Sequence, residues 1–199
     1  MRGFINNGQK SVAGRTISSN GDVYQGGYIN DLPNVYGVQV TDKSRYKGEW
    51  LDGKKHGKGI ELYKDDTFYK GDYENGEKQG HGMFKWKDGT FYEGQIHNSV
   101  IHGTGFYEWE DGKSYRGEFQ NGKMHGHGVF KWKDGREYNG EYQFDKKHGF
   151  GEYKWTNGRS YKGGWKDGKH HGEAEYTSRN GTVRRGLWED GERVKWLQD

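Results

Sequence analysis

Aromatic residues and glycines recur along the chain in a fixed alternating pattern. Tyr-x-Gly-x-aromatic appears first at Tyr24-Gly26-Tyr28, and from Tyr46 onward the tyrosines fall 23 residues apart. The later copies are Tyr46-Gly48-Trp50, Tyr69-Gly71-Tyr73, Tyr92-Gly94-Ile96, Tyr115-Gly117-Phe119, Tyr138-Gly140-Tyr142 and Tyr161-Gly163-Trp165. Because alternate side chains of a strand point to opposite faces, the pattern predicts β-strands with rings and glycines on one face and charged residues on the other.

Each repeat also carries two turn signals. The first is represented by Asp52-Gly53 and Asn121-Gly122, and the second by Asp88-Gly89 and Asp134-Gly135. Asn-Gly and Asp-Gly tolerate the positive φ of tight hairpin turns, so two signals predict two strands per repeat. The expected strands lie near 46–50, 59–64, 69–73, 82–87, 92–96, 105–110, 115–119, 128–133, 138–142, 151–156 and 161–165.

A second glycine pattern, Gly-x-Gly, runs in step with the first. It begins at Gly57/Gly59, recurs every 23 residues and lapses to Gly172/Ala174. Glycine inside a strand often marks close packing against the backbone, so we expect Tyr and Trp rings to lie flat over these positions. The predicted fold is all-β: an elongated single-layer antiparallel β-meander of 23-residue hairpins, forming a twisted rod or trough.

The repeat resembles the MORN (membrane occupation and recognition nexus) repeat, most closely in Tyr46–Gly59 (YKGEWLDGKKHGKG) and Tyr115–Gly128 (YRGEFQNGKMHGHG). The resemblance covers nearly all of 1–199, which we expect to form a single array. We divide it into degenerate N-terminal repeats (1–45), regular repeats (46–183) and an incomplete C-terminal repeat or cap (184–199). The first repeat has Leu32–Gly37 in place of the usual turn and glycines, which predicts a shortened second strand.

Composition narrows the function classes. Only 29% of the 199 residues are apolar, but 16% are aromatic, which is unlike a disordered chain. The net charge of +3 is weak for a nucleic-acid-binding protein, and no nucleic-acid partner is expected. The chain has no Cys, no signal-peptide-like run at its start and no apolar stretch of ~20 residues, so we expect a cytoplasmic protein.

No pattern in the sequence indicates catalysis, a cofactor or a metal site. His56, His102, His125, His148 and His171 form a column, but successive repeats lie roughly 10 Å apart, too far for one zinc ion. The segment Gly53–Gly59 lacks the Ser/Thr and the helix of a phosphate-binding loop. The acids Glu49, Asp72, Glu118 and Glu141 are expected on the outward face with the lysines, among them Lys131 and Lys133.

Function is inferred from the resemblance and from the aromatic surplus. MORN-like arrays imply a non-catalytic scaffold binding protein partners in a cytoskeletal or ciliary assembly, such as the radial spoke of the axoneme. We predict partner binding at second-strand aromatic residues, and a homo-oligomer through the sheet ends at Met1–Ile5 and Arg184–Trp188. The predicted partner-binding residues are Tyr107, Trp109, Phe130, Trp132, Tyr153 and Trp155.

Two alternatives to the scaffold stay open. A stripe of outward lysines suits a peripheral-membrane or phosphoinositide-binding module with weak contact to anionic lipid. MORN-like repeats also occur as regulatory regions of larger enzymes.

Overall fold

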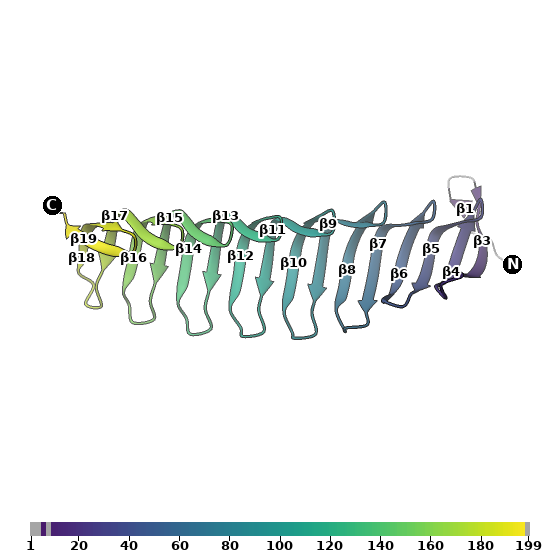
Figure 1. The fold of residues 1–199 in the computed structure, drawn as a ribbon, viewed down its shortest axis with the longest axis horizontal. Coiled ribbons are helices and arrows are strands. Elements are labelled where there is room, and N and C mark those ends of the chain that lie inside the picture. The colour runs from purple at the N-terminus through teal and green to yellow at the C-terminus, as the bar shows by residue number, and fades with distance from the viewer. Residues whose placement is uncertain (1–4, 7–8, 198–199) are drawn as a thin grey trace. The chain divides into compact units, whose positions relative to one another are not determined.

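The computed structural model describes residues 5–6 and 9–197, and side chains from Ser11 to Leu197. The chain forms two compact units, Met1–Val100 and Ile101–Asp199. Each is built from antiparallel strands in sequence order, and the described residues include no helix (Figure 1). The prediction of an all-β antiparallel meander is therefore confirmed.

In the first unit a two-residue ladder, β1 (Ile5–Asn6) with β2 (Gln9–Lys10), precedes the meander. Each later strand pairs with the next along the chain. These strands are β3 (Val12–Ile17), β4 (Val23–Ile29), β5 (Leu32–Val40), β6 (Ser44–Leu51), β7 (Lys54–Tyr63), β8 (Phe68–Glu74), β9 (Glu77–Lys85) and β10 (Phe91–His97).

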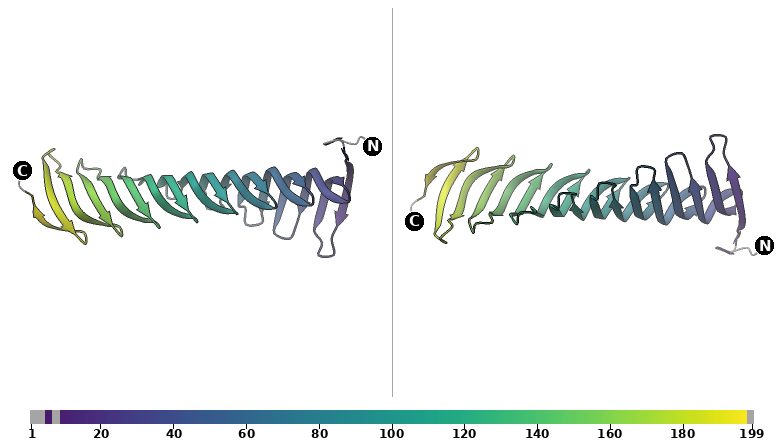
Figure 2. Two further views of the ribbon diagram at one scale, coloured as in Figure 1. Left: turned by 90° about the horizontal axis from the view of Figure 1, so that it is seen from above. Right: turned by 90° about the horizontal axis from the view of Figure 1, so that it is seen from below.

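The second unit repeats the same arrangement from β11 to β19. In each unit the strands lie side by side as one layer, as the views of Figure 2 show. The strands are β11 (Val100–Glu108), β12 (Ser114–Gln120), β13 (Lys123–Lys131), β14 (Glu137–Gln143), β15 (Lys146–Lys154), β16 (Ser160–Lys166), β17 (Lys169–Thr177), β18 (Val183–Glu189) and β19 (Glu192–Trp196).

The predicted strands need four corrections. Second strands begin about five residues earlier than expected, as in β7, because the ladder starts directly after the tight turn. The second strand of the first repeat is not shortened, since β5 has 9 residues like β9. Strand β3 was not anticipated, and Arg184–Trp188 is not an open edge strand, because β18 pairs with both β17 and β19. Of the proposed end strand Met1–Ile5, residues 1–4 lie outside the described part of the chain.

The first turn of each repeat is a two-residue turn with both residues in the left-handed region. Asp52 has a φ of 47° and Gly53 of 79°, which defines the tight turn expected from Asp-Gly. The second turn is longer. In the loop 86–90, Trp86 and Thr90 pair through their backbones, and only Gly89 has a positive φ, 91°.

The regular repeats that begin at Tyr46, Tyr69, Tyr115, Tyr138 and Tyr161 contain a β-bulge beside the first glycine pair. Gly48 pairs with Gly59, but the next residue, Glu49, pairs with His56, so two residues of β7 are extra. The first of them, Gly57, has a φ of 56°, a conformation that glycine adopts at little cost. The strand pairs without a break with β8 on its other side. The sequence interpretation missed this bulge.

The repeat tyrosine covers the glycine pair and closes the bulge. A Cβ atom on Gly140 would lie 2.6 Å from the Tyr138 hydroxyl and 2.7 Å from the Phe150 carbonyl oxygen, so the ring needs a bare backbone below it. The hydroxyl of Tyr138 donates to the carbonyl of Glu141, at the register shift, over 3.0 Å. The equivalent tyrosines Tyr24, Tyr46, Tyr69, Tyr92, Tyr115 and Tyr161 make the same bond three residues along the chain.

The acids on the opposite face also serve the bulge. Glu118 accepts a hydrogen bond from the backbone nitrogen of His127 at 2.9 Å, and Glu141 does the same for Phe150. Glu49 and Asp72 hold the equivalent amides of Lys58 and His81. These outward carboxylates therefore have a structural role that their exposure alone did not suggest.

The buried core is a ladder of rings that contact one another edge to face. Tyr138 meets Tyr142 of its own strand at 88° and Trp165 of the next repeat at 82°, with centroids 5.2 Å apart in both pairs. The repeat tyrosines from Tyr46 to Tyr161 are at most 1% exposed. We call the face that carries this ladder the aromatic face, and the other the charged face.

Replacing Gly140 by Val should lower the free energy of unfolding by about 1–3 kcal/mol, because the branched side chain displaces the Tyr138 ring. Lys131→Ala, on the charged face, is the matched control and should melt like the wild type. Chemical denaturation measures both. Equal stability of the two variants would show that the glycine is not required by the ring.

Candidate functional site

A second row of aromatic side chains lies beside the tyrosine ladder on the aromatic face. In the second unit it is continuous and contains all six predicted partner-binding residues. Successive ring centroids in the row are 4.5 Å (Tyr107–Trp109), 5.3 Å (Trp109–Phe130), 4.5 Å (Phe130–Trp132), 5.3 Å (Trp132–Tyr153) and 4.7 Å (Tyr153–Trp155) apart. The 23-residue period brings these residues together as the sequence indicated.

Exposure divides the row into two kinds of residue. Phe130 and Tyr153 are only 8% and 7% exposed and belong to the core. Trp109, Trp132 and Trp155 are half-buried and keep part of their indole surface open. The accessible part of the row is therefore formed mainly by tryptophans, and the binding role of all six residues remains a prediction.

Basic side chains from the longer loops lie over these tryptophans. Nζ of Lys113 lies 5.4 Å from the ring centroid of Trp109, and Cζ of Arg136 lies 5.3 Å from that of Trp132. Both also pair with loop acids, Asp111 at 3.0 Å and Asp134 at 2.7 Å. In the last of these loops Arg159 covers Trp155 at 5.5 Å, and its hydrogen-bond acceptor is the neutral side chain of Asn157.

In the first unit one position of the second row holds an acid instead of a ring. Glu61 occupies the place that Phe84 has one repeat later, and its side chain is 5% exposed. Lys55 pairs with it at 2.5 Å and Lys78 at 3.5 Å, while the Tyr73 hydroxyl donates to it at 2.9 Å. Hydrogen bonds from the hydroxyls of Ser44 and Tyr63 complete the cluster.

Burial alone would raise the pKa of Glu61, but hydrogen bonds from Lys55 and Tyr63 outweigh it and lower the pKa to about 2. Burial lowers the pKa of Lys78, because it disfavours the charged ammonium form, and the negative charge of Glu61 opposes that shift. The cluster is thus a buried carboxylate held ionised between two lysines.

The second unit has a lysine in the same column without such an acid. Lys147 is equivalent to Lys55 and Lys78, and its Nζ lies 4.5 Å from the ring centroid of Tyr153 and 5.0 Å from that of Trp132. Burial, with a smaller contribution from Arg136, lowers the pKa of Lys147 to about 8. The sequence interpretation missed this residue, although the column of Lys55, Lys78, Ile101, Met124, Lys147 and His170 is visible in the repeat alignment.

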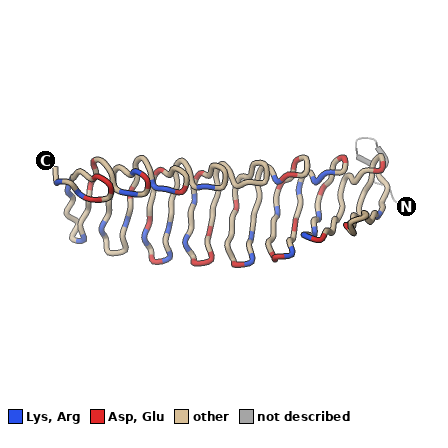
Figure 3. Tube along the Cα trace, viewed as in Figure 1, with Lys and Arg blue, Asp and Glu red and all other residues tan. Residues whose placement is uncertain are grey.

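Acidic and basic residues both occur along the strands of each unit (Figure 3). Lys131 pairs with Glu137 at 3.3 Å and Lys154 with Glu152 at 3.2 Å, as expected for a solvated sheet. Lys87 pairs with Asp66 at 3.5 Å.

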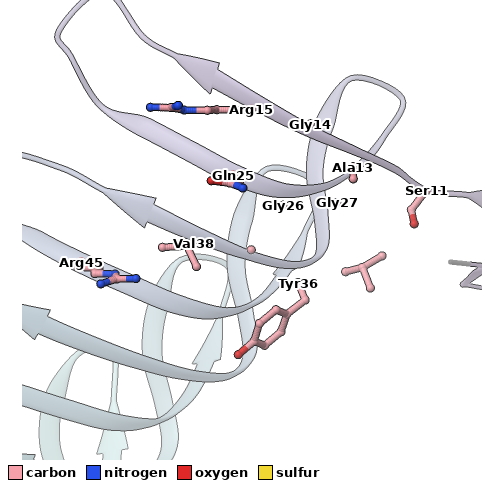
Figure 4. Close-up of a pocket in the computed structure, with 12 residues that line it drawn as sticks. Ser11, Ala13, Gly14, Arg15, Gln25, Gly26, Gly27, Tyr36, Val38 and Arg45 are labelled. Carbon is pink, nitrogen blue, oxygen red and sulfur yellow. The ribbon is translucent and has the colours of Figure 1, made fainter. Parts of the chain in front are cut away.

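Two shallow hollows lie on the first unit. One of about 830 Å³ spans β3 to β6, where Arg15, Gln25, Val38 and Arg45 come from successive strands (Figure 4). The other, of about 520 Å³, is lined by side chains that include Ile60, Met83 and the basic Lys47 and Lys70.

The histidine column lies next to the bulges. His56, His125 and His148 are the register partners of Glu49, Glu118 and Glu141. Within the described ranges, no group of three His, Cys, Asp or Glu side chains is arranged to hold a metal ion. Over the same ranges, no helix has the length and apolar character required to cross a bilayer.

Glu61→Gln should destabilise the first unit by about 3–5 kcal/mol at pH 7, since it leaves two buried lysines without a counterion. The pKa of the wild-type carboxyl is depressed in the folded state. Its stabilising contribution is therefore complete above the ordinary pKa of 4.5 and is lost as the pH falls toward 2.

Thermal melts of the wild type and Glu61→Gln between pH 2 and pH 7 test this. The gap in stability between them should close as the pH is lowered. A gap that is independent of pH would show that the carboxylate charge does not stabilise the fold.

Solved structures of similar fold are found among CPAP domains. The CPAP G-box domain, whose analysis suggested a role in centriole elongation, aligns with a TM-score of 0.53 at 9% identity, over 94% of this chain and all of that one. The wild-type TCP10 domain of Danio rerio CPAP aligns with a TM-score of 0.50 at 14% identity over the whole of both chains. At this identity the likeness concerns the fold alone.

The family comparison covers most of the chain. The model of the MORN repeat matches at 24–42, 46–68, 69–91, 92–114, 115–135, 138–158 and 161–183. MORN repeats are non-enzymatic modules and point to a repeat scaffold that binds proteins. The tyrosine, glycine and bulge pattern described above is the structure of this unit, and the chain belongs to the MORN-repeat family.

Proposed function

We propose that the chain is a non-catalytic scaffold that binds protein partners through the aromatic face of Ile101–Asp199. The observation that carries the proposal is the second aromatic row, in which Trp109, Trp132 and Trp155 stay half-buried after the fold is complete. Tryptophan dominates the binding energy of many protein interfaces, and partly open apolar surface marks interaction sites. Basic side chains beside each indole add polar specificity.

The pairing of charges argues for a protein partner over a lipid surface. A membrane-binding face needs unpaired basic groups within reach of anionic headgroups. On the charged face, Lys131 and Lys154 are paired with glutamates of the same sheet. Lipid contact is therefore the weaker candidate, and vesicle binding that collapses with salt would favour it.

The cellular setting is part of the proposal. We propose a cytoplasmic location in a cytoskeletal or ciliary assembly, including the radial spoke, on the basis of MORN-like scaffolds. CPAP, whose G-box domain shares the fold, has a suggested role in centriole elongation, which suits a cytoskeletal setting. Imaging of the tagged protein tests the location, and light scattering tests the proposed homo-oligomer.

Combined replacement of Trp109 and Trp132 by Ala should abolish or strongly weaken partner capture, because it removes two accessible rings of the row. The matched control replaces Lys131 on the charged face and Lys133 in the loop after β13 by Ala, and it should capture partners like the wild type. Pull-down with quantitative mass spectrometry measures both, and circular dichroism confirms folding. If the folded tryptophan variant keeps its partners while the lysine variant loses them, the binding surface is the charged face.

A further inference from the structure

One column of the repeat carries a half-buried lysine in both units, but only the first unit neutralises it. Glu61 lies six residues after Lys55 and seventeen before Lys78, and it pairs with both. The same two offsets from Lys147 lead to Tyr153 and Phe130. The second unit thus has the lysine and lacks the internal carboxylate.

The surroundings of Lys147 attract its positive charge, but no described residue offers its ammonium group a hydrogen-bond acceptor. Four rings lie around Nζ at 4.5–5.2 Å from their centroids: Trp132, Tyr138, Tyr153 and Trp165. Ring faces attract the charge, yet they accept no ordinary hydrogen bond. Within the described ranges no carboxylate or other acceptor bonds to this Nζ, whereas Lys55 donates to Glu61 and Lys78 to the Tyr63 hydroxyl.

The ammonium group of Lys147 is not fully enclosed. In the part of the chain that the structure describes, the fully buried side-chain nitrogens without a partner are the Nδ1 atoms of His125, His148 and His171. Nζ of Lys147 is not among them, and the residue is half-buried, so the ammonium group keeps some contact with the surface.

We infer that an acidic side chain of a partner protein pairs with Lys147 and supplies the counterion that Glu61 supplies in the first unit. The inference rests on the proposed function and specifies it: the partner segment is rich in Asp or Glu. Its carboxylate would accept hydrogen bonds from Nζ, and apolar side chains on either side of it would cover Trp132 and Trp155.

The charges around Lys147 agree with an acidic partner. The register of β12–β19 places no Asp or Glu of the described residues on the aromatic face. His170, the next residue of the column, is neutral at pH 7, because burial and the charge of Lys147 lower its pKa to about 4. Arg136 is paired with Asp134, whereas the exposed Arg159 lies over Trp155 and donates its side-chain hydrogen bond to the neutral Asn157.

A small hollow continues this surface toward the last strands. It measures about 270 Å³ and is lined by Trp155, Arg159, Trp196 and Arg193 among others. Arg193 lies 4.1 Å from the centroid of Trp196, so a second basic and aromatic pair follows the first. An extended segment with more than one carboxylate fits this series of cations better than a single small anion.

The first experiment selects ligands without assuming their identity. A phage-displayed random peptide library is panned on the full chain and, in parallel, on Lys147→Met, which introduces the residue found in this column at position 124. Peptides selected by the wild type should be enriched in Asp and Glu, and those selected by the variant should not. The same composition on both baits would overturn the inference.

The second experiment measures affinity for the strongest wild-type peptide by fluorescence anisotropy. Lys147→Met should weaken it about tenfold or more, as expected for loss of a charged hydrogen bond. Tyr153→Glu places a carboxylate at the position of Glu61 and should weaken binding much more than its matched control Tyr153→Gln. Lys131→Met, on the charged face, should leave the affinity unchanged, and thermal melts confirm that each variant is folded.

The outcomes separate this inference from the proposed function. If the paired replacement of Trp109 and Trp132 abolishes peptide binding but Lys147→Met does not, the aromatic face binds partners and the assignment to Lys147 is wrong. Equal losses for Tyr153→Glu and Tyr153→Gln would also overturn it. A single-stranded oligothymidine is the nucleic-acid probe. If it competes with the peptide and its binding depends on Lys147 to the same extent, the surface selects anionic ligands in general and the inference of a protein partner is overturned.

Discussion

The structure depends on the contact between the repeat tyrosine and two glycines on paired strands, whose backbone is left bare below the ring. In the repeats that begin at Tyr46, Tyr69, Tyr115 and Tyr138 the ring lies over a pair of facing glycines. Its hydroxyl donates to a carbonyl at the bulge, as Tyr138 does to Glu141. The bulge interrupts the strand ladder, and the phenol restores a hydrogen bond where the ladder is broken. A thin sheet with few aliphatic residues thereby gains a buried core, made of rings in edge-to-face contact.

The period and the turn chemistry were sufficient to predict the fold. Alternation in Tyr46-Gly48-Trp50 identified the aromatic face, and Asp52-Gly53 identified a two-residue turn with positive φ. The bulge was not predicted, because a glycine needed for space and a glycine needed for positive φ look identical in a sequence. The role of Glu118 was missed for a related reason. Its partner is the backbone nitrogen of His127, and a hydrogen bond to the backbone cannot be inferred from which residue supplies it.

Departures from the repeat carry the functional information. Glu61 breaks a column of aromatic residues and neutralises Lys55 and Lys78, whereas Lys147 breaks a neutral stretch of its own column and stays without an acid. Both departures are visible when the repeats are aligned, but their meaning depends on which columns lie next to each other across strands. In a repeat array each unit contacts mainly its neighbours, so such a substitution changes one stretch of surface and leaves the remaining repeats intact.

The most direct test of this account is the free energy of unfolding of Tyr138→Phe compared with Tyr142→Phe. Both rings are buried, but only the Tyr138 hydroxyl bonds to the bulge, and that of Tyr142 bonds to no other described residue. Tyr138→Phe should lower the free energy of unfolding by about 1–3 kcal/mol, while Tyr142→Phe should stay close to the wild type. The Phe150 amide bonds to the Glu141 carboxylate at the same bulge, so it should lose hydrogen-exchange protection in Tyr138→Phe. Equal stability and equal protection in the two variants would contradict the claim that the phenol hydroxyl closes the bulge.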